Sequence, residues 1–72
     1  MKKVEMRASE KAVLNVPETA AYINIAESEI RRLCKIGKIP CFKVGRDFKI
    51  PRVPLIALVE DWGANGVQIS EL

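Results

Sequence analysis

Two short stretches of this sequence carry closely spaced cationic side chains that could take part in chemistry. Their guanidinium and ammonium groups donate hydrogen bonds and carry positive charge, so the chemistry they support is the recognition of anions, above all phosphate. The candidate site residues in the two stretches are Ser28, Arg31, Arg32, Lys35, Lys43, Arg46 and Lys49. They predict a binding surface, and the elements around them must position it.

The residues that enzymes and metal sites use are scarce. The sequence has no His, the commonest general base, and Asp61 beside Glu60 is best explained as the exposed end of a helix. Cys34 and Cys41 have no second cysteine pair and no histidine to complete a zinc site, and we interpret both as structural. We therefore expect no enzyme, no catalytic residue, no metal and no cofactor.

The length and charge of the chain limit its function further. At 72 residues it predicts one small domain, which leaves little room for a buried catalytic cleft. The 12 Lys and Arg outnumber the 9 Asp and Glu only slightly, so the position of the charge matters more than its total. No apolar run is long enough to cross a bilayer, and no apolar segment follows the first lysines. We expect a cytoplasmic location and no membrane partner.

Two short helices are predicted in the first half of the sequence. Asn15 is a good N-cap, Glu18 completes a capping box, and Pro17 is acceptable in a first turn, which predicts a helix over residues 16–23. Asn24 tolerates the left-handed conformation that ends a helix. A second helix is predicted over residues 27–36 and is closed by Gly37. Two helices joined by about three residues form a helix-turn-helix arrangement.

The second helix has two different faces at about 100° per residue. Its core-facing stripe consists of Ile30, Leu33 and Cys34, and the opposite face carries Ser28, Arg32 and Lys35, with Arg31 beside them. The two acids, Glu27 and Glu29, fall on the flanks, where they can pair with Arg31 and Arg32. One interpretation is a recognition helix in the DNA major groove, with arginine donating to guanine. The other is a solvated face with ordinary ion pairs.

A hairpin is predicted over residues 42–50, "FKVGRDFKI", because apolar residues alternate with lysines on both sides of a turn. We expect Gly45, Arg46 and Asp47 to form the loop, which sets Val44 opposite Phe48 and Phe42 opposite Ile50. In that register all four apolar side chains share the inner face, and Lys43, Arg46 and Lys49 point outward. The lysines either protect a sheet edge from aggregation or make the hairpin a DNA-binding wing.

The remaining segments carry weaker patterns. Residues 1–12 read as a flexible basic arm. A third helix, "LIALVEDW", is predicted to start near Pro51 and Pro54 and to end at Gly63. The tail, residues 63–72, is either disordered or an adhesive segment.

The stretch "LNVPETAAYINIAESEIRRLCKIGKIPCFKVGRDFKIPR" resembles the excisionase-type winged helix-turn-helix domains, which are relatives of the MerR DNA-binding domain. The matching motifs are E-x-A-A, then R-L-x-x-x-G-x-I-P, then K-V-G-R and I-P-R. The resemblance implies a small α+β fold, a winged helix-turn-helix over residues 13–62 with a short opening strand, about three helices and a β-hairpin wing. The chain differs at Asn24, where many members have Gly, and at Ala26, where many have a Ser cap worth about 1 kcal/mol.

The resemblance also implies a function. The family binds and often bends double-stranded DNA, and many members are excisionases, recombination directionality factors that direct a tyrosine integrase toward excision. Cooperative self-association on DNA and a nucleoid-associated location in a bacterium are further expectations. Lys38 and Arg52 are candidate contacts to the DNA backbone. A small transcriptional regulator is the alternative, and a protein-docking module, whose binding would survive high salt, is a third hypothesis.

Overall fold

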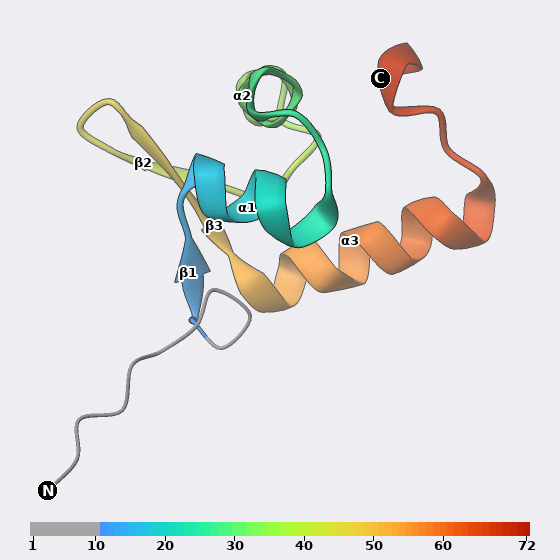
Figure 1. The fold of residues 1–72 in the computed structure, drawn as a ribbon, viewed down its shortest axis with the longest axis horizontal. Helices are drawn as coiled ribbons and strands as arrows, with labels where there is room; N and C mark the ends of the chain where they lie inside the picture. Colours follow the sequence, from blue (N-terminus) through green and yellow to red (C-terminus); the bar gives the residue numbers. More distant parts are fainter. Residues whose placement is uncertain (1–10) are drawn as a thin grey trace, which may run out of the picture.

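The computed structural model describes residues 11–72, so most of the expected basic arm lies outside the described residues (Figure 1). The elements in chain order are β1 (Val13–Leu14), α1 (Val16–Ile23), α2 (Glu27–Lys35), β2 (Phe42–Val44), β3 (Asp47–Pro51), α3 (Arg52–Asn65) and a 3-10 turn, η2 (Ile69–Glu71). The three strands form one antiparallel sheet in the order β1-β3-β2. The expected fold class, a small α+β winged helix-turn-helix, is confirmed.

Helix α1 begins and ends as its sequence predicts. The side chain of Asn15 accepts a hydrogen bond from the Glu18 N–H at 2.8 Å, and the Asn15 N–H donates to Glu18 Oε1 at 3.0 Å. This reciprocal pair is a complete capping box. Asn24 ends the helix in the left-handed conformation, with φ 58° and ψ 47°, and turns the chain toward α2.

Helix α2 buries its apolar stripe, leaves Glu29 and Arg32 partly exposed, and exposes its other residues. Ile30 and Leu33 are fully buried and Cys34 nearly so, as the 3.6-residue period predicts. Ala26 precedes the helix without a side-chain cap, and Gly37 follows it with φ +77°. Because no side-chain hydroxyl caps its first turn, α2 depends on packing against the core for its stability.

The register of the hairpin differs from the expected one. The loop contains only Gly45 and Arg46, so Val44 pairs with Asp47, and Phe42 pairs with Lys49 instead of Ile50. Gly45 adopts φ +63° at the first central position of this two-residue turn, which glycine allows without steric cost. The prediction of a three-residue loop was wrong because it gave Asp47 to the turn, whereas Asp47 begins β3.

This register divides the apolar residues of the hairpin between two faces. Phe48 and Ile50 face the core, whereas Phe42 and Val44 lie on the outer face and remain 48% and 56% exposed. Lys43 is on the inner face, with its Nζ 5.3 Å from the centre of the Phe48 ring. The expectation that four apolar side chains share the inner face was therefore wrong.

Helix α3 is longer than the sequence suggests. It begins at Arg52 and continues through Gly63 to Asn65, and Gly66, with φ +61°, ends it. Gly63 is compatible with a helix interior, although it costs some stability there. Within residues 11–72, no helix is long and apolar enough to span a membrane.

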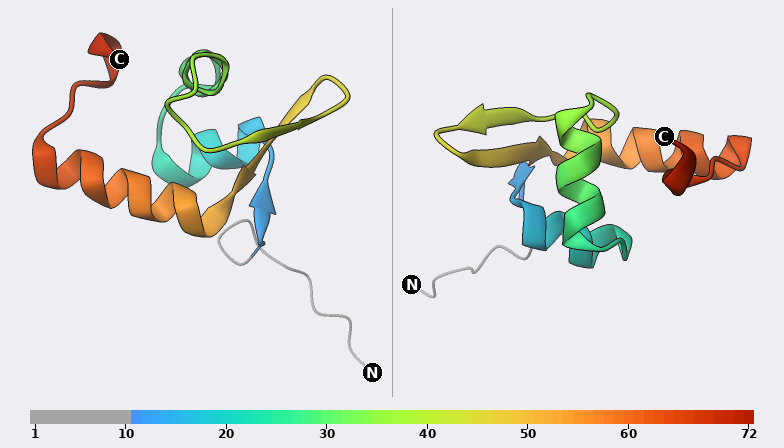
Figure 2. Two further views of the ribbon diagram at one scale, coloured as in Figure 1. Left: turned by 180° about the vertical axis from the view of Figure 1, so that it is seen from behind. Right: turned by 90° about the horizontal axis from the view of Figure 1, so that it is seen from above.

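A single apolar core joins these elements. Its buried hydrophobic members come from β1, α1, α2, the segment before β2, β3 and α3, and are Leu14, Val16, Ile30, Leu33, Cys34, Ile39, Ile50 and Leu55. Helix α2 lies on top of this core, with the hairpin on one side and the C-terminal segment on the other (Figures 1 and 2). The two flanks of α2 therefore face different parts of the chain.

Candidate nucleic-acid interface

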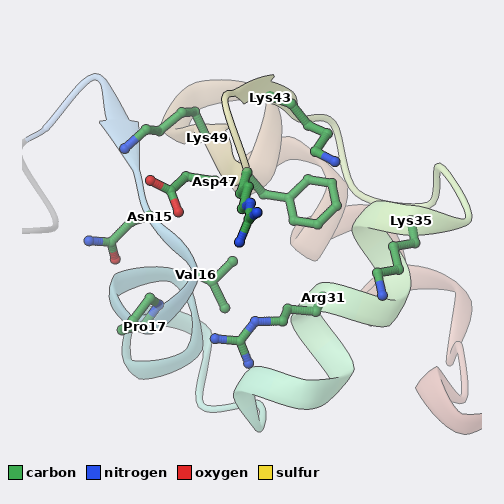
Figure 3. Close-up of a pocket in the computed structure, with 10 residues that line it drawn as sticks. Asn15, Val16, Pro17, Arg31, Lys35, Lys43, Asp47 and Lys49 are labelled. Carbon is green, nitrogen blue, oxygen red and sulfur yellow. The ribbon is translucent and has the colours of Figure 1, made fainter.

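A groove of 530 Å³ lies between α2, the start of α1 and the hairpin (Figure 3). Its lining residues are Asn15, Val16, Pro17, Arg31, Lys35, Lys43, Arg46, Asp47, Phe48 and Lys49. Five of the seven residues that the sequence marks as recognition-helix or wing candidates are in this set. The fold thus brings most of the predicted cationic surface together.

The groove is strongly cationic. Arg31 and Lys35 are one helical turn apart on α2, and Lys43 and Arg46 line the groove from the hairpin, whereas Asp47 is the one carboxylate among the lining residues. Lys49 also borders the groove, but it pairs with Phe42 on the outer face of the hairpin, so the expectation that Lys43, Arg46 and Lys49 share one face was wrong. Figure 3 shows the side chain of Arg31 directed from α2 into the groove, toward Val16 and Pro17 at the start of α1. Cations on both walls suit an extended polyanion that passes between them.

The floor of the groove is less polar and includes the start of α1. Asn15, Val16 and Pro17 line it from the positive end of that helix, and Phe48 lines it from the hairpin. The sequence analysis missed these lining residues. The capping box predicted where α1 begins. Its position next to the cations depends on how α1 packs beside the hairpin, which a local motif does not predict.

Arg31 is available to a ligand. Its Nη2 is 3.3 Å from Glu27 Oε1, and both side chains are about half exposed. A pair of this kind in water contributes little, roughly 0.3–0.5 kcal/mol for an i,i+4 pair, so a phosphate can replace it. The expected Glu27–Arg31 pairing is confirmed.

Arg32 lies outside the groove. Its Nε donates to Glu29 Oε1 at 2.6 Å, and its Nη1 and Nη2 donate to the main-chain oxygens of Leu72 and Ile69 at 2.9 and 3.0 Å. The hydrogen bond from Arg32 lowers the pKa of Glu29, and the same bond raises the pKa of Arg32. The expected pairing of Glu29 with Arg32 is confirmed, but the C-terminal segment holds the rest of the guanidinium.

The other candidate residues are dispersed. Ser28 and Lys38 are exposed and do not line the groove. Arg52 points elsewhere, because its Nε donates to the Lys11 main-chain oxygen at 2.8 Å. The structure therefore brings Lys43 and Arg46 of the wing together with part of the recognition helix. It leaves four candidates apart from them, Ser28, Arg32, Lys38 and Arg52.

The two cysteines lie behind this surface. Both are free thiols, and Cys34 is buried in the core. Burial, followed by the hydrogen bond to Cys41, raises the pKa of Cys34 to about 12, which keeps this thiol protonated near neutral pH. A protonated, buried thiol packs as a small apolar side chain, in agreement with a structural role.

Comparison with known proteins places this surface in a family. Residues 13–62 match the family described as a helix-turn-helix domain. Over 55 residues, the chain is 36% identical to the transcriptional repressor DcmR of Methylorubrum extorquens, an alignment that covers 74% of this chain. The same alignment spans 21% of the length of that relative. No solved structure matches the chain. Because the family match covers more than half of it, the chain belongs to the helix-turn-helix domain family of DNA-binding proteins.

Proposed function

We propose that this domain binds double-stranded DNA through the groove and α2, and that it regulates a process on that DNA. The observation that carries the proposal is the groove, which Arg31 and Lys35 of α2 line together with Lys43 and Arg46 of the hairpin. Duplex DNA offers a major groove wide enough for a helix and a line of phosphates beside it. A helix flanked by a cationic hairpin can occupy the major groove while the hairpin contacts the phosphates beside it.

Each element has a role in this proposal. Helix α2 enters the major groove, where Arg31 and Lys35 reach base edges or the nearest phosphates. The hairpin lies along the sugar-phosphate backbone, and Lys43, Arg46 and Lys49 supply affinity that depends little on sequence. Ser28, exposed on α2, extends the footprint on the duplex.

Two kinds of regulation use this same face. The similarity to a transcriptional repressor favours a transcriptional regulator that acts in the cytoplasm. The resemblance to excisionases favours a second candidate, a recombination directionality factor that bends DNA and directs a tyrosine integrase toward excision. Transcription from a promoter that the domain binds, and excision by an integrase encoded beside it, are the two assays that separate these roles.

DNA binding itself is tested by fluorescence anisotropy with a labelled random duplex over a series of salt concentrations. We expect the logarithm of the binding constant to fall linearly as the logarithm of the salt concentration rises. Arg46→Ala should make this slope shallower by about 0.9, because a phosphate contact is lost. It should weaken binding to cognate and random duplexes about equally.

Lys38→Ala is the matched comparison, because it removes one exposed positive charge outside the groove. We expect it to change the slope less than Arg46→Ala does. Equal effects of the two variants would contradict the groove as the site. The absence of duplex binding at low salt would favour a protein-docking module instead.

A further inference from the structure

The C-terminal segment occupies one whole flank of α2. In two views the hairpin lies on one side of α2 and η2 on the other (Figures 1 and 2). Arg31 faces the hairpin side, and Arg32 faces the C-terminal side through hydrogen bonds to residues 37 and 40 positions later. A duplex laid across α2 would therefore meet the cationic groove on one flank and the tail on the other.

The donors of Arg32 are almost fully used in this arrangement. A guanidinium has five N–H groups. The Glu29 carboxylate accepts from Nε and Nη2, the Ile69 oxygen accepts from Nη2, and the Leu72 oxygen accepts from Nη1. A single N–H remains, whereas bidentate recognition of guanine O6 and N7 needs two N–H groups in one plane.

Apolar packing keeps the tail in this place. Ile69 and Leu72 are partly buried against the core, and the Val67 N–H donates to the Trp62 oxygen at 3.0 Å where the chain leaves α3. The segment also adds an exposed acid, Glu71, to the flank that already carries Glu29. Two carboxylates on this flank oppose the approach of a phosphate backbone.

We propose that residues 67–72 form a latch that competes with DNA for Arg32. In the latched state the domain binds DNA without a contact from Arg32. When the tail leaves α2, Arg32 gains the free donors to read a guanine in the major groove. The latch rests on the proposed DNA-binding function. It adds a second state, with the tail undocked, in which the domain recognises one more base pair.

The test uses a variant in which the tail is undocked, Ile69→Ser with Leu72→Ser, in the full chain. Wild type and variant each select duplexes from a randomised library, and affinities for the selected duplexes are measured by anisotropy. We expect the variant to specify one guanine position that the wild type does not. It should bind its selected duplex about tenfold more tightly than the wild type does, the scale of one bidentate pair.

Arg32→Ala supplies the control for this gain. It should leave wild-type selectivity unchanged and remove the new guanine preference from the undocked variant, so the two changes are not additive. If the undocked variant selects the same sites as the wild type, or if Arg32→Ala lowers selectivity equally in both backgrounds, the latch does not exist.

An NMR titration of the unmodified chain avoids any effect of the substitutions on folding. The Val67, Glu71 and Leu72 amides donate hydrogen bonds in the docked tail, so they should be protected from exchange in the free chain and in its complex with the duplex that the wild type selects. Free exchange of these amides in the unmodified chain overturns the latch. If the wild type binds no duplex at low salt, the proposed function itself fails, so the two failures are distinguishable.

Discussion

Arg31 and Arg32 are adjacent in the sequence, and the step of about 100° between them places their side chains on different flanks of α2. Arg31 reaches the groove beside the hairpin, whereas Arg32 is bound by Glu29 and the tail. Two adjacent arginines of one helix therefore differ: Arg31 is available to DNA, whereas Arg32 is hydrogen-bonded within the chain.

The capping box of α1 makes a prediction at this scale. Asn15→Ala should lower the free energy of unfolding by about 1 kcal/mol, because the Glu18 N–H loses its acceptor. Urea unfolding at neutral pH measures this change. Glu60→Ala, at an exposed position of α3, is the comparison and should change stability by less than about 0.5 kcal/mol. Similar losses for both variants would mean that the cap contributes nothing.

Glu18 adds a dependence on pH. The hydrogen bond from the Lys11 side chain, followed by that from the Asn15 N–H, lowers the pKa of Glu18 in the folded state. Its contribution to stability is therefore present above the unfolded pKa of about 4.3 and is lost as the pH falls through the lower folded pKa. Glu18→Gln should flatten the acid side of the stability profile. An unchanged profile would show that other carboxylates cause the acid loss.

At the scale of elements, two glycines have opposite effects on stability. Gly45 turns the hairpin with φ +63°, and Gly63 lies inside α3 with no positive φ. A Cβ at either position would meet no atom within 4 Å, so only backbone preference decides the outcome.

We therefore expect Gly45→Ala to cost about 1–2 kcal/mol, because the left-handed conformation is unfavourable for alanine. Gly63→Ala should stabilise the chain by about 0.5–1 kcal/mol. Thermal unfolding of both variants measures the difference. Two changes of the same sign would contradict either the two-residue turn or the continuation of α3 through Gly63.

At the scale of the whole molecule, one core supports every element that lines the groove. Ile50 is fully buried and pairs with Leu14 across the sheet, so it connects β3 to both the helices and the other strand. In a small domain the free-energy cost of losing such a residue is comparable to the total free energy of unfolding.

Ile50→Ala should therefore cost about 2–5 kcal/mol, whereas Val53→Ala, at a position that is 66% exposed, should be nearly neutral. Urea unfolding followed by the fluorescence of Trp62 and by circular dichroism measures both. Trp62 is the single tryptophan and packs against the core from α3. Coincident transitions are expected, and an earlier transition of Trp62 would show that α3 unfolds separately.

The sequence by itself determined what depends on neighbours a few residues apart. The Asn15–Glu18 cap, the left-handed Asn24 and the buried stripe of α2 all follow from short-range hydrogen bonds and helical periodicity, and the structure agrees with each. Spacing also predicted that the cations would gather on α2 and the hairpin.

Only the tertiary structure decided which of these cations share a surface. A shift of one residue in the hairpin register moved Lys43 to the inner face and exposed Phe42, and the fold of the tail onto α2 removed Arg32 from the groove. Both outcomes depend on contacts between segments far apart in the chain, whose free energy comes from packing against the common core. Local residue preferences do not contain that information.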